Sequence, residues 1–159
     1  MKTKVAHMGI YLAVAMVCSY VESLIPINFG IPGVKLGLAN IVVLLMLYRV
    51  GWKEALLVAI LRILLTGFMF GNVFSILYSL SGGMLSFVVM LVLIRLDFLH
   101  CISVSIAGGI SHNIGQLTAA AILVSSIQIL YYLPVLLAAG ALTGFLIGLL
   151  VGEIGKRKI

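Results

Sequence analysis

The sequence predicts an all-α integral membrane protein, folded as a bundle of six transmembrane helices. The chain has 159 residues, of which 64% are hydrophobic and only 9% are charged. A water-soluble domain of this size needs more charge to cover its surface. Long apolar runs alternate with short polar or glycine-containing breaks, and basic residues stand at the ends of the runs, as is typical of membrane helices. We therefore expect one transmembrane domain over residues 1–159.

The breaks divide the chain into six expected spans, at about 7–25, 36–49, 54–66, 72–94, 101–126 and 130–151. The second and third are short, since ~1.5 Å per residue gives each about 20 Å against a hydrocarbon core of ~30 Å. Irregular backbone at membrane depth is tolerated only where protein or a water-filled cavity covers it. We therefore expect the loop before the second span, and the 67–71 segment after the third, to dip into the outer leaflet.

Lysine and arginine residues set the expected orientation. The chain has ten of them, and with the N-terminus in the cytoplasm all except Lys35 and Arg62 fall in cytoplasmic segments. This asymmetry follows the positive-inside rule. Both termini are therefore expected in the cytoplasm, in a multi-pass protein of the cytoplasmic membrane. The basic residues serve topology here, so nucleic acid is not an expected partner, whereas membrane lipid is.

Polar residues within the spans are costly and are functional candidates by default. In the expected topology they converge on the outer half of the bundle, and they are Glu22, Lys35, Asn40, Arg62, Asn72, His112, Asn113 and Gln116. We interpret them as the lining of an outward-facing pocket for a small molecule. Because Lys35 and Arg62 outnumber Glu22, the ligand is expected to carry an anionic group.

Structural roles remain open for several of these residues. Glu22 and Arg62 could form an ion pair between helices, and Lys35 could extend its side chain to lipid headgroups. His112 and Asn113 could instead make hydrogen bonds between helices.

Small residues at helical spacing predict close helix packing in the last span. Glycine recurs there at every fourth position, and a weaker small-residue pair lies in the first span; the residues concerned are Gly140, Gly144, Gly148, Gly152, Gly9 and Ala13. Such faces let another helix approach closely in lipid. The partner is either a helix of this chain or one of another protein.

The absence of several sequence motifs excludes some classes of function. No GxxxxGK[ST] loop is present, so we expect no ATP hydrolysis by this chain. Its four acidic residues include a single aspartate, whereas a chain-elongating prenyltransferase needs several carboxylates to hold Mg²⁺ against a diphosphate. We expect no catalytic residues, no metal site and no cofactor.

Three stretches, residues 31–40 (IPGVKLGLAN), 81–83 (SGG) and 109–116 (GISHNIGQ), resemble the bacterial family labelled heptaprenyl diphosphate synthase component I, also called the Gx transporter family. The likeness extends over essentially the whole chain. The family name implies a non-catalytic membrane partner of a soluble polyprenyl synthase, in the bacterial cytoplasmic membrane. The resemblance to this family also implies a link to quinone or other redox membrane complexes.

The family is also similar to the substrate-binding S components of energy-coupling factor (ECF) transporters. That similarity implies an S-component-like six-helix bundle that binds a vitamin, flavin, quinone or isoprenoid precursor beneath a lid at residues 28–35. Uptake would then need an ECF-type transmembrane and ATPase module as partner. The Ala-xxx-Ala docking motif of many S components is replaced here by Gly9-xxx-Ala13. We therefore carry two hypotheses, a transport subunit and a non-catalytic synthase component.

Overall fold

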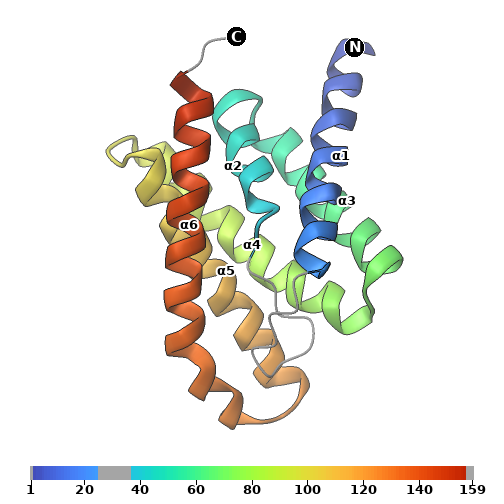
Figure 1. Cartoon of the computed structure of the whole chain (residues 1–159), viewed down its shortest axis with the longest axis vertical. Coiled ribbons are helices and arrows are strands. Elements are labelled where there is room, and N and C mark those ends of the chain that lie inside the picture. The colour runs from blue at the N-terminus through green and yellow to red at the C-terminus, as the bar shows by residue number, and fades with distance from the viewer. Residues whose placement is uncertain (1, 25–36, 157–159) are drawn as a thin grey trace.

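The computed structural model describes residues 2–24 and 37–156, and this part of the chain is entirely helical apart from its connections (Figure 1). It contains six α-helices and one short 3₁₀ helix: α1 (Lys2–Leu24), α2 (Asn40–Arg49), α3 (Trp52–Phe70), α4 (Val73–Leu96), α5 (Cys101–Leu123), η1 (Ile127–Tyr132) and α6 (Leu133–Lys156). The predicted all-α class with six helices is therefore confirmed.

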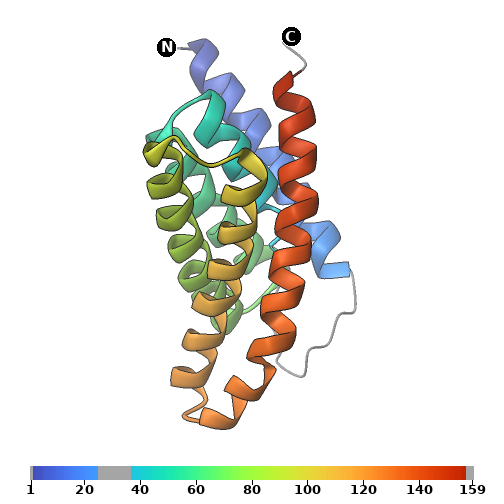
Figure 2. The same ribbon diagram turned by 90° about the vertical axis from the view of Figure 1, so that its left-hand side faces the viewer.

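Successive α-helices run in alternating directions along the long axis of the molecule (Figures 1 and 2). The start of α1, the turn between α2 and α3, the turn between α4 and α5, and the end of α6 all lie toward one end, which we call the terminus end. The connection between α5 and α6 lies at the opposite end, which we call the far end. The segment 25–36, with Lys35 and the expected lid at 28–35, lies outside the described residues.

Within the described part of the chain, three helical segments are long and apolar enough to cross a membrane, as judged by length and composition. They are Val5–Leu24, Val73–Leu96 and Ile127–Gly155, with 20, 24 and 29 residues. A multi-pass membrane protein fits this finding. The count of six spans and the cytoplasmic placement of the termini stay predictions.

Several boundaries differ from the sequence-based expectation; the second helix, for example, begins at Asn40 and not at about residue 36. The expected irregular segment at 67–71 is helical as far as Phe70, so α3 passes straight through Gly67. A methyl group on Gly67 would overlap Ile76 of α4, so this glycine permits close packing and does not end the helix. Glycine in a helix interior costs only about 1 kcal/mol relative to alanine, which tertiary contacts can offset. The fifth helix also ends earlier than expected, at Leu123, and η1 follows.

The glycine face of α6 packs against α5, its most extensive neighbour. A methyl group on Gly140, Gly144 or Gly148 would lie within 2.6–2.7 Å of α5 backbone atoms. Only glycine at these three positions therefore allows the observed approach.

The remaining small residues of this prediction have no close neighbour among the described helices. A methyl group on Gly152 or Gly9 would meet nothing within 4 Å, and Ala13 is exposed. No other helix of the described chain packs closely on these positions, so a helix of another protein remains the predicted alternative there.

Candidate functional site

Six of the predicted site residues lie in the interior of the bundle, contributed by α1, α2, α3 and α5. Each is at most 7% exposed: Glu22, Asn40, Arg62, His112, Asn113 and Gln116. We call these residues the polar cluster. Their depth shows that the described helices bury them as a packed interior, not as the wall of an open chamber.

Glu22 joins the end of α1 to the backbone that leads into α2. Its Oε1 accepts hydrogen bonds from the backbone N–H groups of Gly37, at 2.5 Å, and of Leu38, at 3.4 Å. Both residues precede α2, and buried backbone N–H groups require an acceptor. A buried carboxylate is therefore stabilised at this position, and it fixes the point where the chain enters α2.

Gly37 is required at this point for conformational and packing reasons. Its φ is +86°, a left-handed value that other residues adopt only with strain. A methyl group there would also lie 3.3 Å from the Asn40 side-chain nitrogen and 3.3 Å from the His112 ring. The backbone that leads into α2, the first turn of α2 and the middle of α5 thus meet at Gly37.

Arg62 crosses from α3 to α1. Its Nη1 donates to the Ser19 hydroxyl at 3.2 Å, and the charge of Glu22 acts on its guanidinium. Its Nε is buried and has no hydrogen-bond partner among the described residues. A buried cation is tolerated only when other charges and hydrogen bonds compensate its lost hydration, and α1 supplies both through Ser19 and Glu22.

His112 and Gln116 lie one turn apart on α5, next to a glycine of α4. A methyl group on Gly82 would come within 3.2 Å of the His112 ring and 2.6 Å of Gln116 Cγ. Asn40 reaches α4 nearby, where its Nδ2 donates to the Ser86 hydroxyl at 3.4 Å. His112, Gln116 and Asn40 therefore lie close together where α2, α4 and α5 meet.

Asn113, which belongs to the polar cluster, and Asn72, which does not, both make hydrogen bonds with structural roles. Asn113 Nδ2 donates to the Leu136 carbonyl of α6 at 2.6 Å, which is the interhelical hydrogen bond that the sequence left open. Asn72 is exposed and caps α4, since its Oδ1 accepts from the Ser75 N–H at 2.8 Å. From the sequence, Asn72 was predicted to line the pocket because it stands at the start of an expected span. Asparagine is common at this position because it caps the helix.

The space beside the polar cluster is small. A cavity of about 10 Å³ lies between α2, α4, α5 and α6, bordered by Gly37, Asn40 and Thr143. Such a volume holds roughly one water molecule. The described residues therefore leave no room there for a vitamin-sized ligand.

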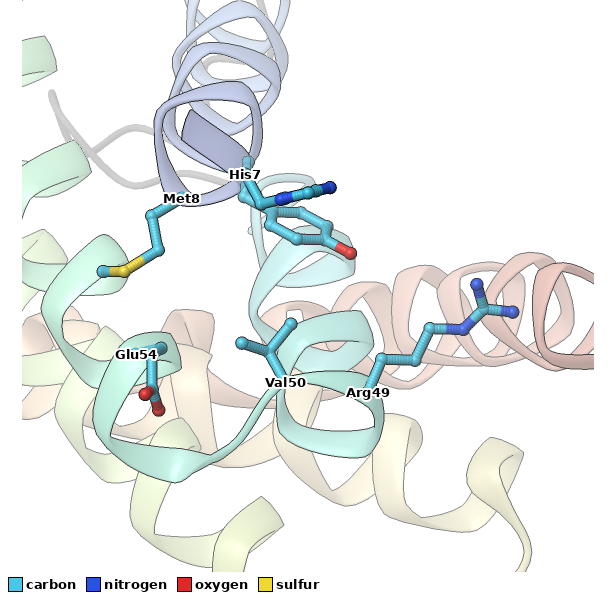
Figure 3. A pocket seen from close by; sticks show the side chains of 6 residues that line it. His7, Met8, Arg49, Val50 and Glu54 are labelled. Atoms are coloured by element: carbon cyan, nitrogen blue, oxygen red, sulfur yellow. The ribbon is translucent and has the colours of Figure 1, made fainter. Parts of the chain in front are cut away.

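Two larger hollows lie on the side of α1, and sequence reasoning missed both. The first, of about 260 Å³, is at the terminus end and is lined by His7, Met8, Tyr11, Arg49, Val50 and Glu54 (Figure 3). We call it the terminal hollow. From the sequence, Arg49 was interpreted only as an indication of membrane orientation, because helix ends at the inner membrane surface commonly carry arginine.

The second hollow, of about 310 Å³, lies between α1, α2 and α6, and its wall includes Cys18, Ile41, Thr143, Leu146 and Ile147. We call it the lateral groove. Apolar side chains dominate the wall. No sequence signal marks it, since it results from the spacing between helices that are far apart in the chain.

The described residues contain no group of three histidine, cysteine or acidic side chains that could hold a metal ion. The fold and interior are those of an α-helical, multi-pass membrane protein with a buried polar cluster. Residues 11–154 match the family model described as Heptaprenyl diphosphate synthase component I. The chain belongs to this family. No curated protein and no solved structure matches it.

Proposed function

We propose that this chain is a non-catalytic membrane subunit of a prenyl diphosphate synthase, onto which a soluble catalytic subunit docks. Family membership over most of the chain is the observation that carries the proposal. The bacterial cytoplasmic membrane is the proposed location, with the terminus end facing the cytoplasm.

The scarcity of carboxylates supports a non-catalytic role. The whole chain has four acidic residues, and Glu22 is engaged with the start of α2. A Mg²⁺–diphosphate site is held by several carboxylates together with the substrate phosphates. Prenyl transfer is therefore assigned to the soluble partner, while this chain holds the enzyme at the membrane.

The terminus end has the composition of a docking surface. Trp52, the first residue of α3, and Phe98, in the turn between α4 and α5, are 42% and 71% exposed, and Lys53 lies 5.6 Å from the Trp52 ring centre. The Tyr48 side chain, near the end of α2, lies beside the Cys101 side chain at the start of α5. Protein interfaces are enriched in aromatic residues, so these turns suit a protein partner.

Purification of the tagged full chain from native membranes tests this proposal. A soluble prenyl diphosphate synthase should co-purify, and the double variant Trp52→Ala/Phe98→Ala should lose it while the chain stays in the membrane. Phe74→Ala/Tyr131→Ala is the matched control, because these aromatic residues are also exposed but lie outside both turns. Equal recovery of the synthase with both double variants, or no synthase with the unaltered chain, would refute the proposal.

A second candidate is an S-component-like transport subunit, working with an ECF-type ATPase module. The observation that favours it is the polar cluster beside Gly37, where the chain emerges from segment 25–36. In this account Lys35 and Arg62 meet an anionic ligand, and the small cavity there opens when the ligand enters.

Native mass spectrometry of the purified chain, with thermal-shift measurements on vitamins, flavins and prenyl phosphates, tests the second candidate. A bound small molecule that is lost in Lys35→Ala but retained in Lys53→Ala would support it. If nothing co-purifies and no compound raises the melting temperature, the transport account fails.

A further inference from the structure

Large apolar side chains surround the turn between α3 and α4, and the bundle leaves them exposed. Each is at least 46% exposed, and they are Phe68, Met69, Phe70, Val73 and Phe74. We call these residues the apolar tip. The Phe70 and Tyr20 ring centres are 5.0 Å apart, so the tip also contacts α1. An exposed apolar patch of this kind indicates contact with a membrane or with another protein.

The sequence around the apolar tip favours lipid as the contact. Residues 63–94, which include the end of α3 and nearly all of α4, contain no lysine, arginine, aspartate or glutamate. The turns at the terminus end differ, because Lys53 and Arg95 stand beside them. Charged side chains collect near membrane surfaces and are costly within the membrane. A stretch without them suits the acyl chains of a bilayer.

The backbone of the same turn needs polar surroundings. Only Gly71 and Asn72 separate α3 from α4, and both are exposed. The last carbonyl groups and the first N–H groups of a helix have no intrahelical partners, and Asn72 satisfies one of them by accepting from the Ser75 N–H. Exposed backbone of this kind is not tolerated in hydrocarbon. The turn therefore belongs at the headgroup boundary, with the apolar side chains in the adjoining acyl chains.

The other end of α3 is also suited to a membrane boundary. Trp52 and Lys53 begin the helix and are exposed, and both residue types are typical of the membrane–water boundary. The Lys53 Nζ lies 5.6 Å from the centre of the Trp52 ring. The lysine charge therefore stays close to the start of the helix.

The two boundaries are closer together than those of a typical bilayer. At ~1.5 Å per residue, the part of α3 from Lys53 to Phe70 rises by about 26 Å, whereas the hydrocarbon core is about 30 Å thick. Any tilt of α3 increases the difference. The opposite side is longer, since the apolar segment Ile127–Gly155 has 29 residues, and the α3–α4 turn stops short of the α5–α6 connection (Figures 1 and 2).

We propose that the apolar tip is a lipid-contact surface that thins the bilayer beside α3 and α4 and therefore gathers phospholipids with short acyl chains. A helix pair shorter than the hydrocarbon core draws the headgroups inward, at a modest cost for each ångström of mismatch. Lipids with shorter chains remove that cost. The inference does not depend on the proposed function or on which end of the bundle faces the cytoplasm.

Tryptophan quenching by a brominated lipid tests the surface, because Trp52 is the single tryptophan of the chain and can be moved. In Trp52→Tyr/Phe74→Trp the tryptophan lies at the apolar tip. In the matched control, Trp52→Tyr/Leu142→Trp, it lies at an exposed position of α6. Each purified full chain is reconstituted with dibromostearoyl phosphatidylcholine, to which either dimyristoleoyl or dierucoyl phosphatidylcholine is added as the short-chain or long-chain competitor.

At the apolar tip, the short-chain lipid should relieve quenching about two- to fivefold more effectively than the long-chain lipid, because it matches the short helix pair. At the α6 position the short-chain lipid should have no such advantage. Thermal denaturation of both variants verifies that they are folded. If Phe74→Trp does not fold, Phe68→Trp replaces it, since Phe68 belongs to the same tip and is 77% exposed.

Three results would overturn the proposal. Equal preference for the short-chain lipid at both positions would assign the effect to the whole bundle. Weak quenching at the tip, with an emission spectrum like that of tryptophan in water, would place the tip outside the lipid. Preference of the tip for the long-chain lipid would show that α3 and α4 match a thick bilayer.

Discussion

Glu22 and Arg62 show how buried charge organises the interior. Glu22 binds the backbone at the start of α2, and its charge acts on Arg62 of α3. Their depths along their helices allowed the sequence to predict that they share one region of the bundle. The sequence could not predict that Glu22 binds the Gly37 N–H, because that contact depends on the course of the chain between α1 and α2.

Replacing Glu22 by glutamine should strongly destabilise the protein. The variant keeps the side-chain volume but leaves Arg62 as a buried cation without its compensating charge, a loss of about 3–5 kcal/mol by analogy with other buried pairs. The double variant Glu22→Gln/Arg62→Gln should recover part of this loss. Thermal denaturation in detergent measures both, and strictly additive effects would show that the two side chains do not interact.

Gly37→Ala should be destabilising in a way that other glycine replacements are not. The left-handed φ costs an alanine roughly 1–2 kcal/mol, and the methyl group would press on Asn40 and His112. Gly155→Ala, at a helical position with open space around it, should be neutral or slightly stabilising. Melting temperatures of the two variants compare them directly, and equal values would contradict the described geometry.

At the level of helices, the periodic apolar pattern predicted the number of helices well and their ends less well. Gly67 looked like a helix end in the sequence, but it is a contact point for α4. Glycine has the same local propensity in both roles, so only the neighbouring helix decides between them. For the same reason the glycine face of α6 was recognisable from spacing, while its partner, α5, was not.

The α5–α6 contact should be sensitive to side-chain size at one glycine and not at another. Gly144→Leu would place a side chain against the Ser105 carbonyl, only 2.6 Å from the Cβ position, and should cost at least about 1–3 kcal/mol. Gly152→Leu meets no atom within 4 Å of its Cβ and should be tolerated. Size-exclusion profiles and melting temperatures in detergent are the readouts, and tolerance of both variants would rule out close packing at Gly144.

For the whole molecule, the alternation of helix directions brings the start of α1, the end of α6 and two turns to the terminus end (Figure 2). Composition alone was sufficient to predict a helical membrane protein. It could not reveal the terminal hollow or the lateral groove, because each is formed by helices that are distant in sequence. The predicted open pocket likewise required space between helices, but the residues of the polar cluster are closely packed in the described part of the chain.

The topology gives a prediction at the same scale. In a variant without native cysteines, a cysteine at Tyr131 should react with a membrane-impermeant maleimide added to intact cells, since the positive-inside rule predicts that the far end faces outward. A cysteine at Lys53 should react only after the membrane is opened. Both positions are exposed in the structure, so a reversed labelling pattern would mean that the orientation is inverted.

The most direct test of the central claim is complex formation between the purified full chain and the soluble prenyl diphosphate synthase of the same genome. The account predicts co-elution of the two proteins in size-exclusion chromatography, and loss of the complex for Trp52→Ala/Phe98→Ala alone. It also predicts prenyl transfer by the synthase and none by this chain on its own. Separate elution of the two unaltered proteins, or prenyl transfer by this chain alone, would contradict the account.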